Sequence, residues 1–249
     1  MQSPGGSYVW YARIAPMYIT LLPVAIGIGV WFPETRMLEQ ISVVVLSPGV
    51  LAVLLGEKGR DRGRRKQGEL WAKWGGPLLT QYLHHSNTDI NQHLRLEYHQ
   101  KLRQLLPNLA IPSSEEEETK DREGARNVYD ACAQHMVNVV REDPKRYWSA
   151  FKENRSYGLR RNLWGLKPLG VTCSIVGAAS AALALGLRWE GPETISAPWV
   201  VSILCCVGLF VFWCTVTPNW VRIANDAYVR RVLESLPRMG EQDALGTST

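Results

Sequence analysis

The chain has 249 residues, of which 46% are hydrophobic and 20% charged, and it carries a net charge of +5 at pH 7. This length permits one or two soluble domains, but the apolar residues gather near the two ends of the chain and leave a polar middle. Soluble domains place apolar residues at a period of two or about 3.6, so this distribution argues against a soluble protein.

Four long apolar runs predict membrane-spanning helices, because a helix needs roughly 20 apolar residues to cross the hydrocarbon core. The expected spans cover about 14–32, 38–56, 169–187 and 195–216. The uncharged run of the second span, residues 41–56, is the shortest and reaches the bounds 38–56 only if Leu38 joins it. The alternative for it is a buried soluble hairpin. The sequence thus predicts an all-α, four-span integral membrane protein, with two transmembrane hairpins and a helical cytoplasmic insert.

The expected organisation has four parts. Residues 1–56 form an N-terminal arm and the first hairpin, and 57–168 form a cytoplasmic helical domain with basic, membrane-proximal ends. Residues 169–216 form the second hairpin, and 217–249 form a cytoplasmic amphipathic helix and a disordered tail.

The basic residues predict the orientation. All 28 Lys and Arg residues except Arg36 and Arg188 fall on one side of the membrane in this arrangement. Cytoplasmic loops carry the excess of Lys and Arg. We therefore expect both termini and residues 57–168 in the cytoplasm, and the chain in the inner (plasma) membrane of a bacterium.

Two basic clusters lie beside the expected spans, where cations meet anionic lipid headgroups at about 1 kcal/mol each. They comprise Lys58, Arg60, Arg62, Arg64, Arg65, Lys66, Arg155, Arg160, Arg161 and Lys167. Basic runs also neutralise nucleic-acid phosphates. Because the membrane position already accounts for both clusters, the bilayer is the expected partner and nucleic acid is not.

The insert reads as helical. Pro77 opens a short helix that ends near His84, and a longer helix carries an apolar stripe and stops before Pro107. The stripe consists of Ile90, Leu94, Tyr98, Leu102 and Leu105. Ser114 with Glu117 predicts a capping box for a further helix that continues to about Val139.

No motif in the insert defines a reaction. The candidate catalytic residues are His84, His85, His93, Glu97 and His99, but they lack the i,i+4 histidine pair of zinc hydrolases. The run of glutamates from Glu115 to Glu118 is read as a solvated helix start that complements the helix dipole. No metal site and no cofactor are predicted.

Aromatic residues and turn formers gather where the insert approaches the expected spans. They are Trp71, Trp74, Gly75, Gly76, Pro77, Tyr157, Trp164 and Pro168. Two interpretations stay open for them. They form an interfacial aromatic belt with ordinary turn chemistry, or they are joints that couple the insert to the membrane.

The third expected span carries small residues at spacings of three and four, which lets helices approach closely in lipid. They are Gly170, Ser174, Gly177, Ala178, Ala181 and Ala182. Such a face packs either within one chain or between subunits, and we expect a homo-oligomer.

The leading functional hypothesis is a non-enzymatic membrane protein that couples a partner-binding cytoplasmic helical domain to a transmembrane bundle, as a sensor or membrane effector. In architecture alone, the chain is similar to small multi-span proteins that bacteria pair with cytosolic sensors in anti-phage defence. One alternative is a membrane-tethered enzyme with a His/Glu site in the insert. Another is an oligomeric channel or pore.

Overall fold

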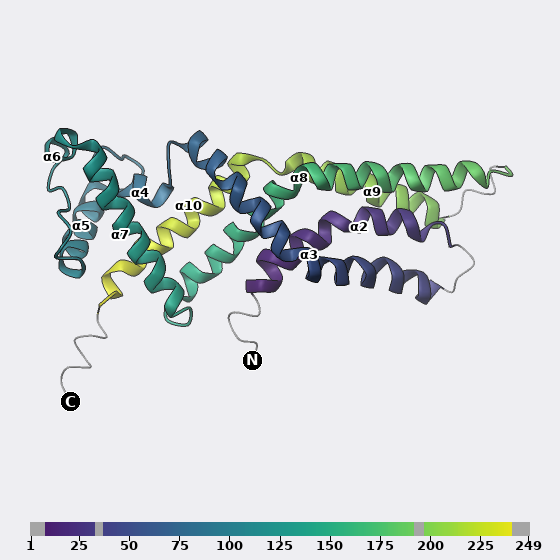
Figure 1. Ribbon diagram of the computed structural model, residues 1–249, viewed down its shortest axis with the longest axis horizontal. Coiled ribbons are helices and arrows are strands. Elements are labelled where there is room, and N and C mark those ends of the chain that lie inside the picture. The colour runs from purple at the N-terminus through teal and green to yellow at the C-terminus, as the bar shows by residue number, and fades with distance from the viewer. Residues whose placement is uncertain (1–7, 33–36, 192–196, 241–249) are drawn as a thin grey trace, which may run out of the picture. The chain divides into compact units, whose positions relative to one another are not determined.

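The computed structural model describes residues 8–32, 37–191 and 197–240, and every regular element in these ranges is a helix (Figure 1). The all-α expectation is confirmed for these ranges. The predicted disordered tail after Gly240 lies outside the described residues. The elements are η1 (Trp10–Ile14), α2 (Ala15–Gly29), α3 (Met37–Trp74), α4 (Leu78–Leu83), α5 (Gln92–Leu105), α6 (Glu115–Lys120), α7 (Arg122–Glu142), α8 (Trp148–Leu187), α9 (Ala197–Thr215), α10 (Pro218–Ser235) and η3 (Leu236–Arg238).

The chain divides into two compact units. Unit 1 comprises Met1–Gly68 and Arg155–Val221, and unit 2 comprises Glu69–Asn154 and Arg222–Thr249. The boundaries fall inside α3, α8 and α10, so each of these helices contributes residues to both units.

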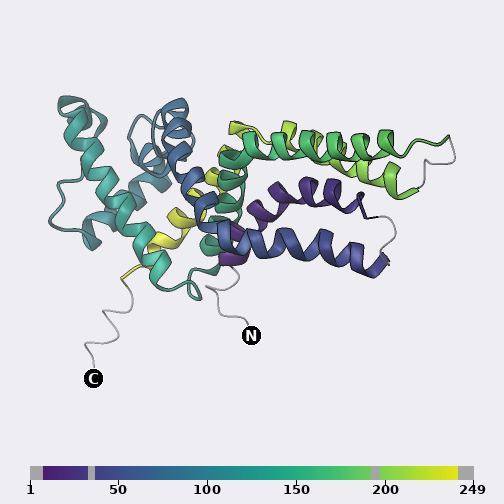
Figure 2. The same ribbon diagram turned by 45° about the vertical axis from the view of Figure 1, so that its right-hand side comes forward.

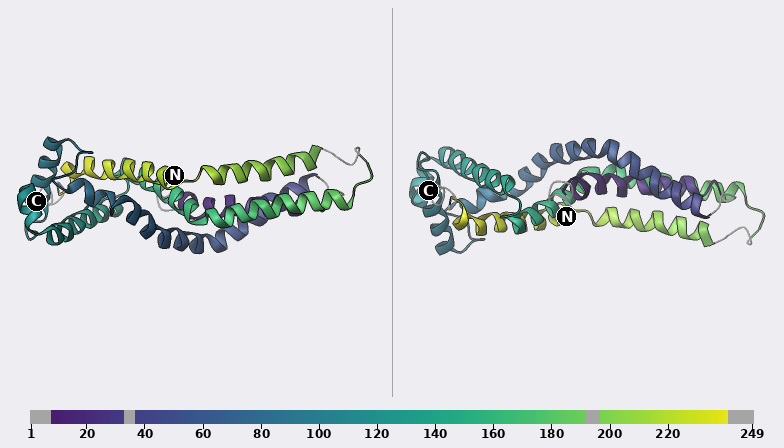
Figure 3. Two further views of the ribbon diagram at one scale, coloured as in Figure 1. Left: turned by 90° about the horizontal axis from the view of Figure 1, so that it is seen from above. Right: turned by 90° about the horizontal axis from the view of Figure 1, so that it is seen from below.

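Unit 1 is a bundle in which α2, α3, α8 and α9 lie side by side (Figures 1 and 3). One core cluster joins Met17 of α2, Ala52 of α3, Leu166 of α8 and Trp213 of α9. A second cluster joins α2, α8 and α9 through buried Val30, Ala181, Ala184 and Trp199. Segments of both predicted hairpins therefore share one interior.

The outside of this bundle is apolar as well. Exposed large hydrophobic side chains occur on all four helices, and they are Ile28, Val45, Leu46, Val50, Leu51, Val53, Leu54, Ile175, Val176, Leu183, Leu187, Val200, Val201, Leu204, Val207, Phe210 and Val211. Water-soluble domains rarely expose contiguous apolar surface on this scale, whereas a bundle in lipid does so along its spans.

Two of the described helical segments are long and apolar enough to cross a membrane, namely Trp10–Gly29 and Trp148–Leu187. Trp199–Thr215 and Pro218–Arg238 meet the same requirement only as a pair, which gives a third candidate. The predicted span at 38–56 lies in α3, which is not among these candidates. The side chains of residues 37–44 lie outside the described part of the chain. The four-span arrangement therefore remains a prediction.

Proline in the first candidate span leaves a backbone carbonyl with which a side chain of another helix forms a hydrogen bond. Pro16 has no N–H to donate to Ala12 four residues earlier, and Ala15 instead donates its N–H to Trp10 O in the π-helical turn of η1. The buried side chain of Asn162 in α8 donates a hydrogen bond to Ala12 O. A freed carbonyl must find such a partner where water is excluded.

The small residues of α8 meet α2 and α9 within the same chain. A Cβ on Gly177 would overlap Pro23 O and lie 3.1 Å from Cys206 Sγ, and one on Gly170 would overlap the Trp213 ring. Ser174 and Ala181 are buried too, while Ala178 is half-buried and Ala182 is exposed. Glycine is thus required at the closest helix contacts of the bundle.

Unit 2 has a separate core, built from the end of α3, α4, α5, α7, the larger part of α10 and η3 (Figures 1 and 2). Its largest fully buried side chains are Tyr129, Leu70, Leu78, Leu83, Leu102, Met136, Leu233, Leu236, Met239 and His99. The buried face of α7 includes Tyr129, Cys132 and Met136, while His135 is only half-buried.

The structure corrects the predicted start of the helix that carries the stripe from Ile90 to Leu105. α5 begins at Gln92, because the Asn91 side chain accepts a hydrogen bond from His93 N, so Ile90 precedes the helix. Its buried face then consists of Arg95, Tyr98, His99 and Leu102, whereas Leu94 is exposed.

The helix expected from Glu115 to about Val139 is two helices. The Asp121 side chain accepts a hydrogen bond from Gly124 N and starts α7 anew. Ser114 caps α6 as predicted, accepting from Glu117 N at 3.3 Å.

Candidate functional site

Three of the five candidate catalytic residues come together around Glu118 in unit 2. α4 ends at Leu83, which places His84 and His85 beside the first turn of α6. The Glu118 carboxylate lies 2.5 Å from His84 Nδ1, and it accepts hydrogen bonds from His85 N at 2.8 Å and from Tyr129 OH at 3.3 Å. We name this set, together with His99, the Glu118 cluster.

Glu118 is buried, which corrects the expectation that all four glutamates from Glu115 to Glu118 are solvated. It is only 7% exposed, in contrast to its exposed neighbours Glu115 to Glu117. A signal was present, because Glu118 precedes Ala125 by seven residues and Tyr129 by eleven, which continues the buried helical stripe.

His99 lies at the bottom of the cluster with no exposed surface. Its Nε2 is 2.8 Å from Leu83 O, and since a carbonyl only accepts, Nε2 carries the proton. Nδ1 is consequently a bare acceptor, and it has no hydrogen-bond partner among the described residues. The His85 ring meets the His99 ring edge-on, with centroids 4.6 Å apart.

Burial sets the charge states in the cluster. Burial lowers the pKa of His99 from 6.5 to about 4, so the ring is neutral at pH 7. Burial alone would raise the pKa of Glu118, but hydrogen bonds from His85 N and His84 outweigh it and hold that pKa below its usual value. Burial and the neighbouring Glu118 raise the pKa of Tyr129.

The remaining two candidates lie apart from the cluster. His93 and Glu97 are exposed on α5, while His99 is on its buried face. Within the described ranges, no group of three or more His, Cys, Asp or Glu residues is placed to hold a metal ion.

Cys132 of α7 is not a reactive thiol. Burial raises its pKa to about 11, which keeps it protonated and weakly nucleophilic.

The Glu118 cluster is a buried hydrogen-bond network that joins helices of unit 2. One ionised carboxylate accepts hydrogen bonds from His84 and His85, which follow α4, and from Tyr129 of α7, and these contacts hold the end of α4 and the start of α6 against α7. A neutral, buried imidazole then joins α5 to the end of α4.

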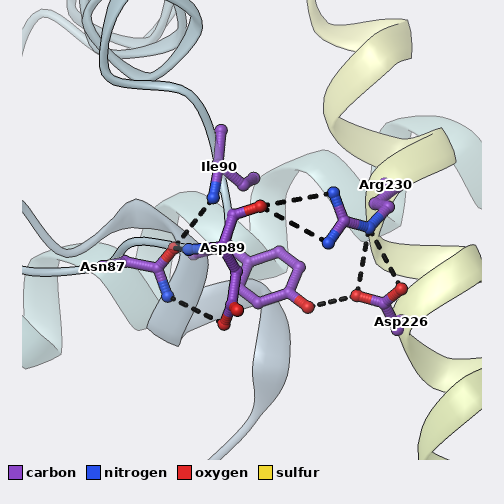
Figure 4. Close-up of polar contacts among 6 residues, drawn as sticks. Asn87, Asp89, Ile90, Asp226 and Arg230 are labelled. Atoms are coloured by element: carbon purple, nitrogen blue, oxygen red, sulfur yellow. Dashed lines mark hydrogen bonds and ion pairs between the residues drawn. The ribbon is translucent and has the colours of Figure 1, made fainter.

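A second polar network ties the loop before α5 to the part of α10 that belongs to unit 2 (Figure 4). Arg230 donates from Nε to both carboxylate oxygens of Asp226, at 3.1 and 3.0 Å, and from both terminal nitrogens to Asp89 O at 3.4 Å. Tyr82 OH donates to Asp226 Oδ1. Burial and this hydrogen bond raise the pKa of Tyr82 to about 12.

The loop itself is shaped by Asn87. Its Oδ1 accepts from Asp89 N at 2.9 Å and from Ile90 N at 3.3 Å, as Figure 4 shows. Only the Asp226–Arg230 spacing of four residues was readable from the sequence as a helical ion pair. The contacts to Tyr82 and Asp89 depend on the tertiary fold.

The first predicted joint is a glycine-based helix end. Gly75 has a φ of 84° and follows Trp74, the last residue of α3, and Gly76 N donates to Trp71 O at 2.8 Å. This hydrogen bond closes a Schellman motif. Gln81 Nε2 from α4 then donates to Trp74 O and Gly76 O, at 2.9 and 2.7 Å, and Pro77 is the N-cap residue of α4.

The second predicted joint, at Tyr157, Trp164 and Pro168, lies inside α8 of unit 1, and the helix continues through Pro168 without a break. The basic residues around it form hydrogen bonds and cation–π contacts with other residues of unit 1. Arg160 lies over the Trp220 ring at 4.8 Å and donates to Trp220 O at 3.0 Å.

Two further cations of α8 have partners of the same kind. Arg161 donates to Gln67 Oε1 at 3.0 Å, and Lys167 donates to Val216 O at 2.8 Å. Arg155 lies over the Tyr11 ring, 4.4 Å from its centroid.

The basic residues of α3 differ from those of α8. Lys58, Arg62, Arg64 and Arg65 are exposed, whereas Arg60 pairs with Glu57 at 2.8 Å.

Compared with protein-family models, curated proteins and solved structures, the chain matches none of them.

Proposed function

We propose that the chain is a non-enzymatic, four-span membrane protein in which unit 1 lies in the bilayer and the cytoplasmic unit 2 binds a protein partner. The observation that carries the proposal is the surface of unit 1. Exposed apolar side chains cover its helices, and basic residues follow them on α3 at Lys58, Arg62 and Arg65. A helix that leaves hydrocarbon for the headgroup region has this order of side chains.

The proposed topology places both termini and residues 57–168 in the cytoplasm of a bacterium and spans at about 14–32, 38–56, 169–187 and 195–216. It is supported by the distribution of the 28 Lys and Arg residues, of which only Arg36 and Arg188 fall on the outer side.

Cysteine labelling with a membrane-impermeant maleimide tests this topology. The two variants are Glu115→Cys and Trp189→Cys, both at exposed positions, and the unsubstituted chain reports the background from its own five cysteines. We expect Trp189→Cys to be labelled in intact spheroplasts and Glu115→Cys only after lysis. Labelling of Glu115→Cys from outside contradicts the topology, and extraction of the chain by alkaline carbonate contradicts membrane insertion.

The proposed role of unit 2 is partner binding. The structure favours this over catalysis because His84, His85 and His99 make structural contacts, while His93 and Glu97 lie apart from them. We place the pair of unit 2 and its partner in a sensor or effector system, with phage defence as the specific case.

Phage plating tests that role. A host that carries the gene with its flanking genes should plate phage less efficiently than one with the flanking genes alone. The His93→Ala and Glu97→Ala variants should protect as well as the original chain, since both positions are exposed. Loss of protection by either variant at normal protein levels would favour an enzyme instead.

A further inference from the structure

We propose that one face of α3 in unit 1 binds the headgroups of anionic phospholipids, and that the basic residues of α8 do not. This face, called the α3 lipid face below, consists of Leu51, Leu54, Lys58, Arg62 and Arg65. The inference rests on the proposed membrane insertion of unit 1 and narrows the expected lipid contact to three of the ten basic residues.

The five residues share one side of the helix. They follow one another at spacings of three, four, four and three, which keeps them on a single helical stripe. Leu51 is 46% and Leu54 is 69% exposed, and Lys58, Arg62 and Arg65 are also exposed. The stripe changes from apolar to cationic between Leu54 and Lys58, within about one helical turn or 6 Å of rise.

The three cations of the stripe are not neutralised by the chain. The nearby acidic residues are engaged by other partners. Glu57 lies 2.5 Å from Arg13 and 2.8 Å from Arg60, and Asp61 lies 3.4 Å from Arg60. In the described part of the chain, Lys58, Arg62 and Arg65 have no ion-pair partner.

The α8 set shows the opposite situation. Its half-buried cations form hydrogen bonds within unit 1. Arg160 donates to Trp220 O, Arg161 to Gln67 Oε1 and Lys167 to Val216 O. A guanidinium or ammonium that already donates to the protein has fewer donors left for a phosphate.

The chemistry of the α3 lipid face selects its ligand. A phospholipid presents an acyl chain next to a phosphodiester, and the stripe presents leucines next to three cations. Phosphatidylglycerol has a net negative charge, whereas phosphatidylcholine is neutral, so the cations should favour the former. A nucleic acid would satisfy the cations but would leave the leucines without an apolar partner.

Native mass spectrometry of the full-length chain in a mild detergent tests the proposal, with phosphatidylglycerol and phosphatidylcholine titrated separately. The test variant is Lys58→Gln/Arg62→Gln/Arg65→Gln. The control variant is Lys120→Gln/Arg122→Gln/Arg126→Gln, which removes the same charge from exposed positions in unit 2. Gln keeps a good helix propensity in both variants.

We expect the test variant to bind phosphatidylglycerol about tenfold or more weakly than the original chain, which follows from roughly 1 kcal/mol per basic residue. The control should bind it unchanged, and phosphatidylcholine binding should be the same in all three. Equal phosphatidylglycerol binding by the test variant, or an equal loss in the control, overturns the proposal.

Displacement of phosphatidylglycerol from the original chain by a single-stranded oligonucleotide also overturns it, in favour of nucleic acid. Failure here is distinguishable from failure of the proposed function. A chain that resists carbonate extraction but binds both lipids equally refutes only the α3 lipid face, whereas a carbonate-soluble chain refutes membrane insertion itself.

Discussion

A single carboxylate organises the polar interior of unit 2. The Glu118 carboxylate accepts hydrogen bonds from His84, His85 N and Tyr129, while its neighbours in the same acidic run are exposed to solvent. A buried carboxylate that accepts several hydrogen bonds is stabilised in its charged form. Its partners would be left unsatisfied and buried if it were removed.

Replacement of Glu118 should therefore be costly. We expect Glu118→Ala to lower the free energy of unfolding by about 2 kcal/mol or more, because it leaves His84 and Tyr129 without their acceptor. Glu116→Ala, at an exposed position of the same helix turn, should change it by less than about 0.5 kcal/mol. Urea unfolding of the full chain in detergent measures both, and equal effects would contradict a structural role for Glu118.

His99 should make the stability of unit 2 depend on pH. Its pKa is about 4 in the fold and 6.5 in an ordinary setting, so between these values the unfolded chain binds a proton that the folded chain does not. Stability should thus be full above pH 6.5 and fall as the pH drops toward 4, by on the order of 1 kcal/mol per pH unit. The charged groups Arg95 and Arg103 and the nearby His85 act in the same direction, since each disfavours a cation at His99.

The matched variant is His99→Gln, whose amide can still donate to Leu83 O but does not titrate. The difference in unfolding free energy between the original chain and this variant should shrink or reverse from pH 7 to pH 4.5. A constant difference over this range would show that His99 does not stay neutral in the fold.

Two glycines of α3 have different roles, one at the end of the helix and one in its interior. Gly75 ends α3 with a positive φ, which costs a side-chain-bearing residue about 1–2 kcal/mol. Gly68 lies in the interior of the same helix, where an added Cβ would have nothing within 4 Å, so there glycine only lowers helix stability.

These two positions predict opposite outcomes for the same substitution. Gly75→Ala should destabilise the chain by about 1 kcal/mol or more, and Gly68→Ala should stabilise it by about 0.5–1 kcal/mol. Urea unfolding followed by circular dichroism distinguishes them. A stabilising Gly75→Ala would mean that α3 continues past Trp74.

The crossing of α8 with α2 and α9 gives a second matched pair. A methyl group at Gly177 would overlap the backbone oxygen of Pro23, while one at Gly186 would touch nothing within 4 Å. Gly177→Ala should therefore lower the apparent melting temperature in detergent, since overpacking costs about 1–3 kcal/mol. Gly186→Ala should leave it unchanged or slightly raised, and similar melting temperatures for both variants would contradict the close helix contact.

In the molecule as a whole, the two units differ in the polarity of their surfaces. Unit 1 has an apolar exterior and satisfies a proline-freed carbonyl from a neighbouring helix. Unit 2 has polar helix surfaces around an apolar core and fastens its elements with the Glu118 and Arg230 networks.

This contrast predicts two steps of denaturation. Urea should unfold unit 2 first, while the detergent-covered helices of unit 1 keep their internal backbone hydrogen bonds to higher concentration. Circular dichroism should show two losses of helical signal, and Glu118→Ala should shift only the first. One cooperative loss that Glu118→Ala shifts as a whole would contradict independent units.

The helical class, the apolar runs and several helix ends were predictable from the sequence, because these depend on local composition. The Ser114 cap, the end of α5 before Pro107 and the short α4 followed from residues close in the chain. The start of α5 and the break at Asp121 were missed, since Asn91 and Asp121 compete with other polar residues that could cap equally well.

Which polar residues are buried together depends on the packing of helices that are distant in the chain. Glu118 meets His84 across 34 positions, Asp226 meets Tyr82 across 144, and Asn162 meets Ala12 across 150. No periodicity reports such pairs, because burial depends on which helix covers a given face. For the same reason, the two basic clusters look alike in the sequence but differ in the fold. The basic residues of α8 donate hydrogen bonds to Trp220 O, Gln67 Oε1 and Val216 O, whereas Lys58, Arg62 and Arg65 of α3 are exposed.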